Sequence, residues 1–573
     1  MSGGRWTALG NGAPRSTLRG TLMSHFPRFV PRALALLLAL GVSPDLPAAA
    51  TERPNLVVIL ADDMGFSDLG CYGGEIETPH LDALARGGLR FSQFYNTARC
   101  SPTRAALLTG LDPHAAGMGT LAEDPNKRAP ADAAAGYQEF LNDRCLTLAE
   151  ALKPAGYRSY LAGKWHLGYH DRPKWPLQRG FDRFYGIISG ASSYFRPAAP
   201  RGLTLDNTPL PTPEGADYYT TDAFTDHALR FLREHPAGTP FFLYLAFNAP
   251  HWPLHARAED IARFKGRYRD GWDELRRSRH ARQRELGVVD PGTQLSPRDD
   301  GARAWTALEA EQREQLDYRM AVYAAQVHRM DWNVGRVVEA LRDLGRLDDT
   351  LILFLSDNGA CAEPYTDLGG GDFAAINQPA AGGAGGRNAP RGGSSYGTGW
   401  ANASNTPFRR YKSRLHEGGI ATPLIAHWPA GLKAAAGSWH RTPGYLTDIM
   451  PTALELAGVA YPAAQDGRAL TPLAGRSLVP ALRGEAMPGG RWLFWEQYGN
   501  KAVRHGDWKA VQPAEDGSPW ELYDLAADRT ELRDRAGERP DLVQRLTARW
   551  EQWAEANQVL PKKRPAPGPA PQR

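Results

Sequence analysis

Three short and almost continuously apolar segments constrain the fold of this chain more than any other feature. They span residues 55–60, 241–247 and 351–355, and each is followed closely by polar or charged residues. An unbroken apolar run of this length fits a strand that is buried on both faces of a parallel sheet. Helical patterns over residues 146–152 and 315–344 alternate with these runs, so the sequence predicts a doubly wound α/β sheet.

Oxygen-bearing side chains end two of these predicted strands. Asp62 and Asp63 follow the first strand, and Asp357 and Asn358 follow the third. Open α/β sheets carry their sites at the carboxyl ends of the strands, where these four side chains can converge. Adjacent carboxylates are costly unless a cation or a donor compensates them, although a solvated turn would also accommodate the first pair. An all-oxygen set suits calcium or magnesium rather than zinc.

Histidine and lysine side chains lie in the loops after two other predicted strands. His251 follows the 241–247 run in a turn, so it has the same placement as the carboxylates. Lys164 and His166 lie in a glycine-flanked loop, and residues two apart on an extended chain can face the same way. A lone lysine is more often a surface residue and a lone histidine a core residue, so these positions alone do not assign a site.

A cysteine at the start of a short helix is a candidate nucleophile. Ser101 can cap a helix that continues to Gly110, which places Cys100 at the helix N-terminus. The free N–H groups and the helix dipole there favour anions and developing negative charge. Arg104 returns to the same side of the helix and can offer a forked cation to an oxyanion. The same pattern would also suit a reactive thiolate or a buried structural cysteine.

Three segments together resemble the type I sulfatases of the alkaline phosphatase-like superfamily. They are Cys-x-Pro-x-Arg at 100–104, Gly-Lys-Trp-His-Leu-Gly at 163–168 and Asn-Thr-Pro-Phe-Arg-x-x-Lys at 405–412. The third segment ends at Lys412, in a basic run that would otherwise suggest a solvated surface. The resemblance covers nearly all of the chain after residue 50. It implies a large mixed, mainly parallel sheet flanked by helices.

The resemblance implies an arylsulfatase-type enzyme that hydrolyses a sulfate ester to an alcohol or phenol and inorganic sulfate. In that family a formylglycine-generating enzyme oxidises the cysteine that matches Cys100, and the hydrated formylglycine is the nucleophile. One divalent metal, usually calcium, with magnesium the alternative, binds at the positions that match Asp62, Asp63, Asp357 and Asn358. The substrate is a small-molecule or carbohydrate sulfate ester, which the sequence does not specify further.

The resemblance also assigns roles to the other candidates. Lys164, Lys412 and Arg104 are expected to stabilise the sulfate oxygens during in-line attack on sulfur. His251 is expected to protonate the departing alcohol, and His166 to assist deprotonation of the second hydroxyl, which expels sulfate. The alternatives are a phosphonate monoester or phosphodiester hydrolase of the same superfamily and an inactive glycan-sulfate-binding protein.

The first 50 residues have the pattern of a secretory signal peptide. Arg28 and Arg32 precede an apolar run over residues 33–42, and small residues over 46–50 offer a cleavage site. The run is too short to span a membrane, for which about 20 apolar residues are needed. We therefore expect an exported protein, periplasmic or secreted, with no stable membrane span.

The composition of the rest of the chain predicts how it divides into domains. A sulfatase catalytic domain is expected over residues 51–485, with a glycine-rich surface loop at about 369–399. Residues 486–560, which contain several close strands and then a helix, are expected to form a small α+β C-terminal domain. Residues 561–573, rich in proline and basic residues, are expected to be disordered.

The charge of the chain indicates which partners to expect, and its cysteine content limits which disulfides can form. The net charge is only +4, and the 67 lysines and arginines and 63 acids are interspersed, so we expect no nucleic-acid partner. The four cysteines are Cys71, Cys100, Cys145 and Cys361. Oxidation of Cys100 leaves an odd number, which cannot all pair within one chain. The sequence leaves open which of the others form a disulfide.

Overall fold

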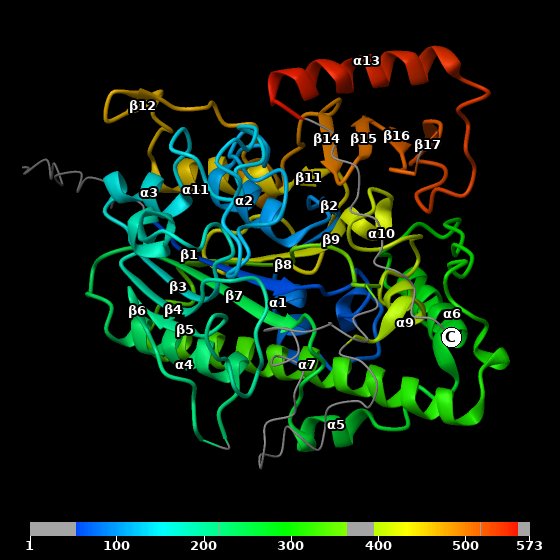
Figure 1. Cartoon of the computed structure of the whole chain (residues 1–573), viewed down its shortest axis with the longest axis horizontal. Helices are drawn as coiled ribbons and strands as arrows, with labels where there is room; N and C mark the ends of the chain where they lie inside the picture. The colour runs from blue at the N-terminus through cyan, green and yellow to red at the C-terminus, as the bar shows by residue number, and fades with distance from the viewer. Residues whose placement is uncertain (1–52, 216, 364–394, 516, 560–573) are drawn as a thin grey trace, which may run out of the picture. The chain divides into compact units, whose positions relative to one another are not determined.

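Strand β1 (Asn55–Asp62) lies at the centre of the large sheet in the computed structural model of the chain (Figure 1). It pairs in parallel with β7 (Phe241–Pro250) on one side and with β8 (Thr350–Ser356) on the other. These strands contain the three apolar segments. Every residue in them is buried, so the prediction of buried parallel strands is confirmed.

The structure describes residues 53–215, 217–363, 395–515 and 517–559. The predicted signal peptide and the predicted disordered tail lie outside these residues. Most of the predicted glycine-rich loop also lies outside them.

The large sheet has eleven strands in a mixed, mainly parallel arrangement. The strand order is β10, β2, β9, β8, β1, β7, β3, β4, β5, β6, and β11 pairs with β2. Strand β9 runs antiparallel to both β8 and β2, whereas β3 and β4 extend the parallel part beyond β7. The predicted fold class is therefore confirmed. The bounds of these strands are β2 (Leu89–Tyr95), β3 (Arg158–Lys164), β4 (Arg183–Ile187), β5 (Leu203–Leu205), β6 (Thr208–Pro209), β9 (Ala421–His427), β10 (Trp439–His440) and β11 (Gly444–Tyr445).

Helices cover both faces of the large sheet (Figure 1). On one face lie α1 (Pro79–Arg86), α4 (Thr220–Arg233) and α7 (Ala310–Asp343). On the other lie α2 (Cys100–Thr109), α3 (Leu148–Leu152) and α11 (Ile449–Ala457). Further helices are α5 (Ala258–Phe264), α6 (Gly271–Glu285), α9 (Gly397–Ser404), α10 (Glu417–Ile420) and α12 (Val479–Leu482).

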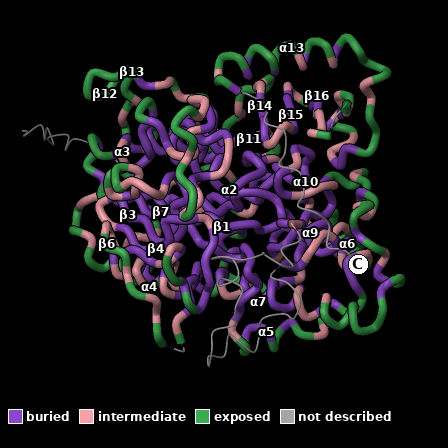
Figure 2. The backbone as a smooth tube through the Cα atoms, viewed as in Figure 1, coloured by how far each residue is buried: buried purple, intermediate pink, exposed green. Residues whose placement is uncertain are grey.

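The side chains of β1 show why helices are needed on both sides. Val57 and Ile59 pack in the hydrophobic cluster that contains α4 and α7, whereas Leu56 and Leu60 pack in the cluster that contains α2 and α11. Alternate residues of a strand point to opposite faces, so a fully apolar strand requires apolar cover on each face. Figure 2 shows the buried backbone that runs through this sheet.

Two helix boundaries differ from the sequence expectation. Helix α7 begins at Ala310 rather than at residue 315, because Glu309 and Gln312 form a capping box at its start. Helix α9 begins at Gly397, inside the tract expected to be a loop, because the fully buried Trp400 packs against Trp272 with ring centroids 5.3 Å apart. Among the described residues, no helix is long and apolar enough to cross a membrane.

A second, smaller sheet follows the large one in the chain. Its four antiparallel strands are β14 (Trp492–Gln497), β15 (Asn500–His505), β16 (Trp508–Gln512) and β17 (Glu521–Asp524). Helix α13 (Pro540–Ala556) packs Leu546 and Trp550 against Val503 and Leu522 of this sheet. The predicted α+β C-terminal region is therefore confirmed. A separate hairpin, β12 (Ala464–Gln465) and β13 (Arg468–Ala469), precedes it.

A buried ionic cluster joins the two sheets. Lys509 of β16 lies 3.0 Å from Glu417 of α10 and 2.9 Å from Glu531, and all three side chains are fully buried. The Glu531 carboxylate also accepts a hydrogen bond of 2.7 Å from the Glu417 backbone N–H. Nearby, the Trp495 indole of β14 donates to the Asn96 carbonyl at 2.8 Å, so the small sheet is anchored to the chain just before α2.

Candidate functional site

Cys100 is the first residue of α2, as predicted, but the helix is not capped by Ser101. Arg99 occupies the N-cap position without a side-chain cap, and the Ser101 hydroxyl instead accepts a hydrogen bond from the Ala122 N–H at 3.0 Å. The prediction that Ser101 is the cap was therefore wrong, because that hydroxyl holds a neighbouring loop. Gly110 ends the helix in a left-handed conformation with φ of 68°, as expected.

The predicted metal ligands come together at the carboxyl ends of β1 and β8. Because Ala61 pairs with Ser356, the residues that follow in each strand emerge side by side. The Asp63 N–H donates to Asp357 Oδ1 at 3.0 Å, and Asn358 Nδ2 donates to Asp63 Oδ1 at 2.7 Å. All four side chains, those of Asp62, Asp63, Asp357 and Asn358, are buried.

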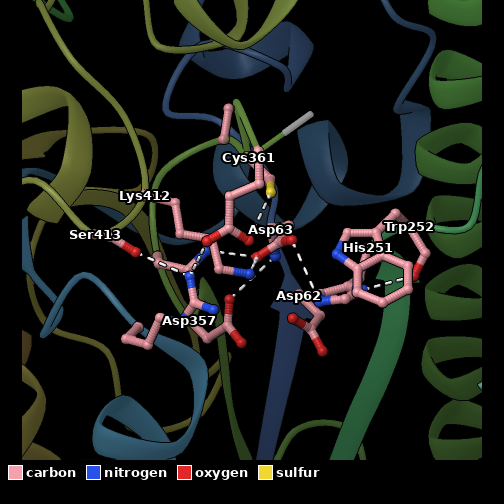
Figure 3. Close-up of polar contacts among 12 residues, drawn as sticks. Asp62, Asp63, His251, Trp252, Asp357, Cys361, Lys412 and Ser413 are labelled. Carbon is pink, nitrogen blue, oxygen red and sulfur yellow. Dashed lines mark hydrogen bonds and ion pairs between the residues drawn. The ribbon is translucent and has the colours of Figure 1, made fainter. Parts of the chain in front are cut away.

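Three predicted cationic side chains contact these carboxylates. Lys164 Nζ, at the end of β3, lies 2.5 Å from Asp62 Oδ2. Lys412 Nζ lies 2.6 Å from Asp63 Oδ1, and Figure 3 shows this contact. The Arg104 guanidinium is fully buried and reaches Asp62 Oδ2 at 3.2 Å and the Lys164 carbonyl at 2.9 Å. These N–H donors of Arg104 therefore already have hydrogen-bond acceptors within the protein.

The first turn of α2 is fixed to the acidic cluster. The Thr103 hydroxyl donates to the Asp357 carbonyl at 2.6 Å, and the Ser413 N–H donates to the Ala98 carbonyl at 2.9 Å. These contacts place the start of the helix between the strand end and the segment that carries Lys412. Cys100 is itself buried, and the Arg104 and Lys412 cations lie near enough to interact with it electrostatically.

The charges of the cluster leave one carboxylate poorly compensated. Burial raises the pKa of Asp357 well above its ordinary value, and the neighbouring Asp62 carboxylate adds to this effect. Burial also disfavours the Asp62 carboxylate, but the charges of Lys164, His251 and other cations outweigh it and lower the pKa of Asp62. A further positive charge at this place would stabilise all the acids in their ionised form.

The donor atoms of the cluster fit a hard divalent cation. Asp62 Oδ1, Asp63 Oδ2 and Asn358 Oδ1 are buried and have no hydrogen-bond partner among the described residues. Asp62, Asp63 and His251 each offer a ligand atom within 4.8 Å of the others. Buried oxygen atoms without partners are costly, and a cation would satisfy them. His251 is the addition that the sequence did not suggest as a ligand.

The two predicted histidines both reach the site but differ in setting. His251 Nε2 lies 3.5 Å from Asp63 Oδ2, while its Nδ1 lies 2.6 Å from the Trp252 carbonyl (Figure 3). Burial lowers the pKa of His251 to about 4 although the nearby carboxylates oppose the shift. His166 follows β3 with a left-handed φ of 56°, and burial and the Lys164 charge lower its pKa well below the ordinary value.

Several residues near the site were not predicted from the sequence. Arg99 forms an ion pair with Glu363 and donates to the Ser413 hydroxyl at 2.9 Å. The Arg99 guanidinium also lies 5.5 Å from the ring centroid of Tyr498, which comes from the small sheet. No local motif marks these residues, because their proximity depends on how segments up to 399 positions apart in the chain are packed, as in the Asn96–Trp495 contact. All four cysteines, including Cys361 near this group, are free thiols.

Comparison with known families identifies the family of the chain. A model of the sulfatase family matches residues 54–459 of the chain. The chain belongs to the sulfatase family. A second model, for the C-terminal region of N-sulphoglucosamine sulphohydrolase, matches residues 408–555 and includes the small sheet. The resemblance to type I sulfatases of the alkaline phosphatase-like superfamily is therefore confirmed, and the sulfatase is a sulfuric ester hydrolase.

Similar proteins cover most of the sulfatase. An arylsulfatase of Klebsiella aerogenes is 36% identical over 465 residues, which cover 78% of this chain and 95% of that protein. An uncharacterised sulfatase of Schizosaccharomyces pombe is 34% identical over 528 residues, or 88% of this chain and 93% of the relative. An N-acetylgalactosamine-6-sulfatase of Rattus norvegicus is 32% identical, and the match covers 77% of this chain and 68% of that protein.

Solved structures agree with the fold. The crystal structure of Ps i-CgsB in complex with k-i-k-neocarrahexaose matches with a TM-score of 0.64 and 25% identity, over 90% of this chain and 95% of that one. The predicted activity, hydrolysis of sulfate esters, is confirmed by these family relationships. A metal ion and formylglycine are general features that family membership implies.

Proposed function

We propose that this sulfatase is an exported, calcium-dependent enzyme that uses a formylglycine made from Cys100 and acts on carbohydrate sulfates. The observation that carries the proposal is the fixed start of α2, where position 100 lies beside a buried set of paired acids and cations. Membership of the sulfatase family supports the formylglycine. The sugar ligand of Ps i-CgsB supports the substrate class.

Asp62, Asp63, Asp357 and Asn358 are the proposed metal ligands, with His251 at the edge of the set. Three buried oxygen atoms without partners among the described residues support this choice. When bound, a calcium ion supplies positive charge that offsets the ester's sulfate oxygens and the acids that surround them. Calcium is preferred over magnesium because the four ligands come from the ends of two separate strands, β1 and β8, and calcium tolerates irregular coordination better.

Lys164 and Lys412 are the proposed sulfate-binding cations. The Lys164 ammonium lies 2.5 Å from an Asp62 oxygen, and the Lys412 ammonium lies 2.6 Å from an Asp63 oxygen. Each ammonium has further N–H groups that can donate hydrogen bonds to sulfate oxygens. Because the lysines are fixed before substrate binds, their charges need little reorganisation as negative charge develops. Arg104 contributes its charge to the same group and also fixes the Lys164 backbone through the carbonyl contact.

His251 is the proposed general acid for the leaving alcohol. A carbonyl can only accept a hydrogen bond, so the Nδ1 of His251 is the protonated nitrogen in the contact with Trp252. Nε2 is then the free nitrogen and faces the acidic cluster. It takes up the proton that the attacking hydroxyl loses and gives it to the leaving alcohol as the ester S–O bond breaks. His166 is the proposed base that takes the proton of the second hydroxyl of the formylglycine; the C–O bond to the sulfate then breaks, sulfate leaves and the aldehyde is restored.

A substrate comparison tests this proposal. Enzyme produced with a formylglycine-generating enzyme is assayed with 4-nitrophenyl sulfate, a phenyl phosphonate monoester and a phosphodiester of 4-nitrophenol. We expect the sulfate to give the highest kcat/KM, and the Cys100→Ala variant to lose turnover of all three. A higher kcat/KM for either phosphorus ester would instead favour the phosphonate monoester or phosphodiester hydrolase.

Export and domain division are further parts of the proposal. Residues 1–50 are proposed to be a signal peptide, residues 51–485 the catalytic domain, 486–560 the C-terminal domain and 561–573 a disordered tail. Sequencing the N-terminus of protein recovered from a periplasmic or culture fraction tests the first point. We expect the mature chain to begin near residue 51, and an N-terminus at residue 1 would contradict it.

A further inference from the structure

The turn between β14 and β15 has an unusual residue at a demanding backbone position. Gln497 pairs with Asn500, so the turn consists only of Tyr498 and Gly499, with φ of 51° and 82°. A two-residue turn with positive φ at both positions favours asparagine, aspartate or glycine in the first place. Tyrosine has no local side-chain hydrogen bond that offsets the left-handed conformation.

The hairpin of β12 and β13 shows the ordinary solution to the same turn. Its two turn residues are Asp466 and Gly467, with φ of 50° and 77°, and they follow the favoured Asp-Gly pattern. Asp466 is exposed and Tyr498 is only partly exposed. The two turns therefore have the same backbone requirement in different surroundings. Residues held in such unfavourable backbone conformations cluster at functional sites.

The tyrosine turn reaches the start of α2. The Arg99 guanidinium lies 5.5 Å from the centroid of the Tyr498 ring, and Arg99 directly precedes Cys100. Asn500 anchors the turn, because its Nδ2 donates to the Ser413 carbonyl at 3.2 Å and to the Gln497 carbonyl at 2.9 Å. The small sheet thus presents a ring beside Arg99, the residue that precedes the nucleophile position.

A continuous row of contacts leads from this ring to the opposite side of the site. Arg99 pairs with Glu363, and the Cys361 thiol donates to Glu363 Oε2 at 3.6 Å. Cys361 in turn packs with Trp252, next to the general acid His251. Asp63, Trp252 and Cys361 also line one pocket. We define this row of five residues, Trp252, Cys361, Glu363, Arg99 and Tyr498, as the rim.

The rim has the chemistry of a sugar-binding surface. Tyr498, at one end, is the partly exposed aromatic ring, whereas Trp252 at the other end is buried. Between them lies the ion pair of the buried Arg99 and the partly exposed Glu363. The apolar face of a pyranose packs on aromatic rings, while its hydroxyl groups both donate and accept hydrogen bonds. A carboxylate and a guanidinium supply the matching acceptors and donors. A purely apolar alcohol would leave these charged groups without compensation for their lost hydration.

We propose that Tyr498 is a specificity-determining residue that packs against the sugar ring of a carbohydrate sulfate ester, so that the small sheet completes the substrate site. This inference rests on the proposed function, since it names the residue that binds the alcohol portion of that substrate. The left-handed turn places the ring beside the Arg99 guanidinium, and Arg99 directly precedes Cys100.

Three variants test the assignment: Tyr498→Asn, Tyr498→Phe and the control Asp466→Asn. They are compared on 4-nitrophenyl sulfate and on whichever of galactose 6-sulfate, N-acetylgalactosamine 6-sulfate and glucosamine 6-sulfate the wild type hydrolyses fastest. Tyr498→Asn is expected to raise KM for the sugar about five- to tenfold, the range for one lost aromatic contact, and to leave kcat on the aryl ester within about twofold. Its Tm should equal or exceed that of the wild type, because asparagine tolerates the left-handed turn.

The other variants separate binding from structure. Tyr498→Phe keeps the ring and is expected to keep a KM close to that of the wild type, and Asp466→Asn is expected to change neither KM nor Tm. An unchanged sugar KM in Tyr498→Asn would overturn the inference, as would equal losses on the aryl and sugar esters. Hydrolysis of the aryl ester without hydrolysis of any of the three sugars would also overturn it but leave sulfatase activity intact. Failure on all the esters would refute the proposed function itself.

Discussion

Replacing Lys509 with methionine is expected to destabilise the contact between the two sheets. The ammonium lies 3.0 Å from Glu417 and 2.9 Å from Glu531, and none of the three side chains is exposed. Burial lowers the pKa of Lys509, but the two carboxylates outweigh this and raise it above the ordinary value. The substitution removes the shared cation and leaves two buried acids close together.

The size of the effect follows from that imbalance. Removing one partner from a buried ion pair costs about 3–5 kcal/mol, because the remaining charge is not compensated. Arg529 also approaches Glu417, at 3.4 Å, and is mostly buried, so it offsets part of the loss. We therefore expect a loss of about 3 kcal/mol. With about 2 °C for each kcal/mol in a large domain, Tm should fall by about 6 °C.

Thermal denaturation followed by circular dichroism measures this change, with a surface ion pair as the control. Arg128 and Asp171 lie 2.9 Å apart with 62% and 43% of their side chains exposed. Arg128→Met should cost less than about 1 kcal/mol. Adding Glu417→Gln and Glu531→Gln to Lys509→Met should recover part of the loss, because the two buried carboxylates are then neutral, and the recovery stays partial because Arg529 loses its partner. Equal Tm values for Lys509→Met and Arg128→Met would refute the reasoning.

Three further predictions concern the site and its surroundings. A Cβ at Gly190 would lie 2.5 Å from His166 Nε2, so Gly190→Ala should displace the ring and lower kcat about 100-fold. Gly292 has open space around it, so the control Gly292→Ala should leave kcat unchanged in the same assay. Burial lowers the pKa of His255 from 6.5 to about 4, so the unfolded state binds more protons than the folded state in that pH range. The free energy of unfolding should therefore fall by about 3 kcal/mol as pH drops from 6.5 to 4. Chemical denaturation of His255→Gln should show a smaller fall, and a pH profile identical to that of the wild type would contradict this. Chelation with EDTA should lower both activity and Tm, and added calcium should restore both better than magnesium; an unchanged Tm would contradict a metal at the acidic cluster.

Most of the fold could be predicted because the decisive signals are local. Each of the segments 55–60, 241–247 and 351–355 is apolar at every position or nearly so, and at this length the pattern fits a strand that is buried on both faces. The four strands and the final helix of the small sheet also follow from local alternation and turn residues. Helix α9 was missed because the burial of Trp400 against a distant tryptophan, rather than helix propensity, stabilises it.

The site could be predicted in part for the same reason. The acids at the ends of β1 and β8 converge because parallel strands end at one edge of a sheet. The exact partners of Arg104 could not be predicted, since they depend on its burial against Lys164 and Asp62. Tyr498 gave no signal in its own segment, because its place beside Arg99 is created only when the small sheet packs on the large one.

The most direct test of the central claim is mass spectrometry of the peptide that contains Cys100. The protein is expressed together with a formylglycine-generating enzyme, digested and compared with protein expressed without it. We predict the mass of an aldehyde or its hydrate at position 100 in the first sample, together with sulfatase activity in proportion to the modified fraction. An unmodified thiol in fully active enzyme would contradict the claim, because the nucleophile would then be the cysteine itself or another group.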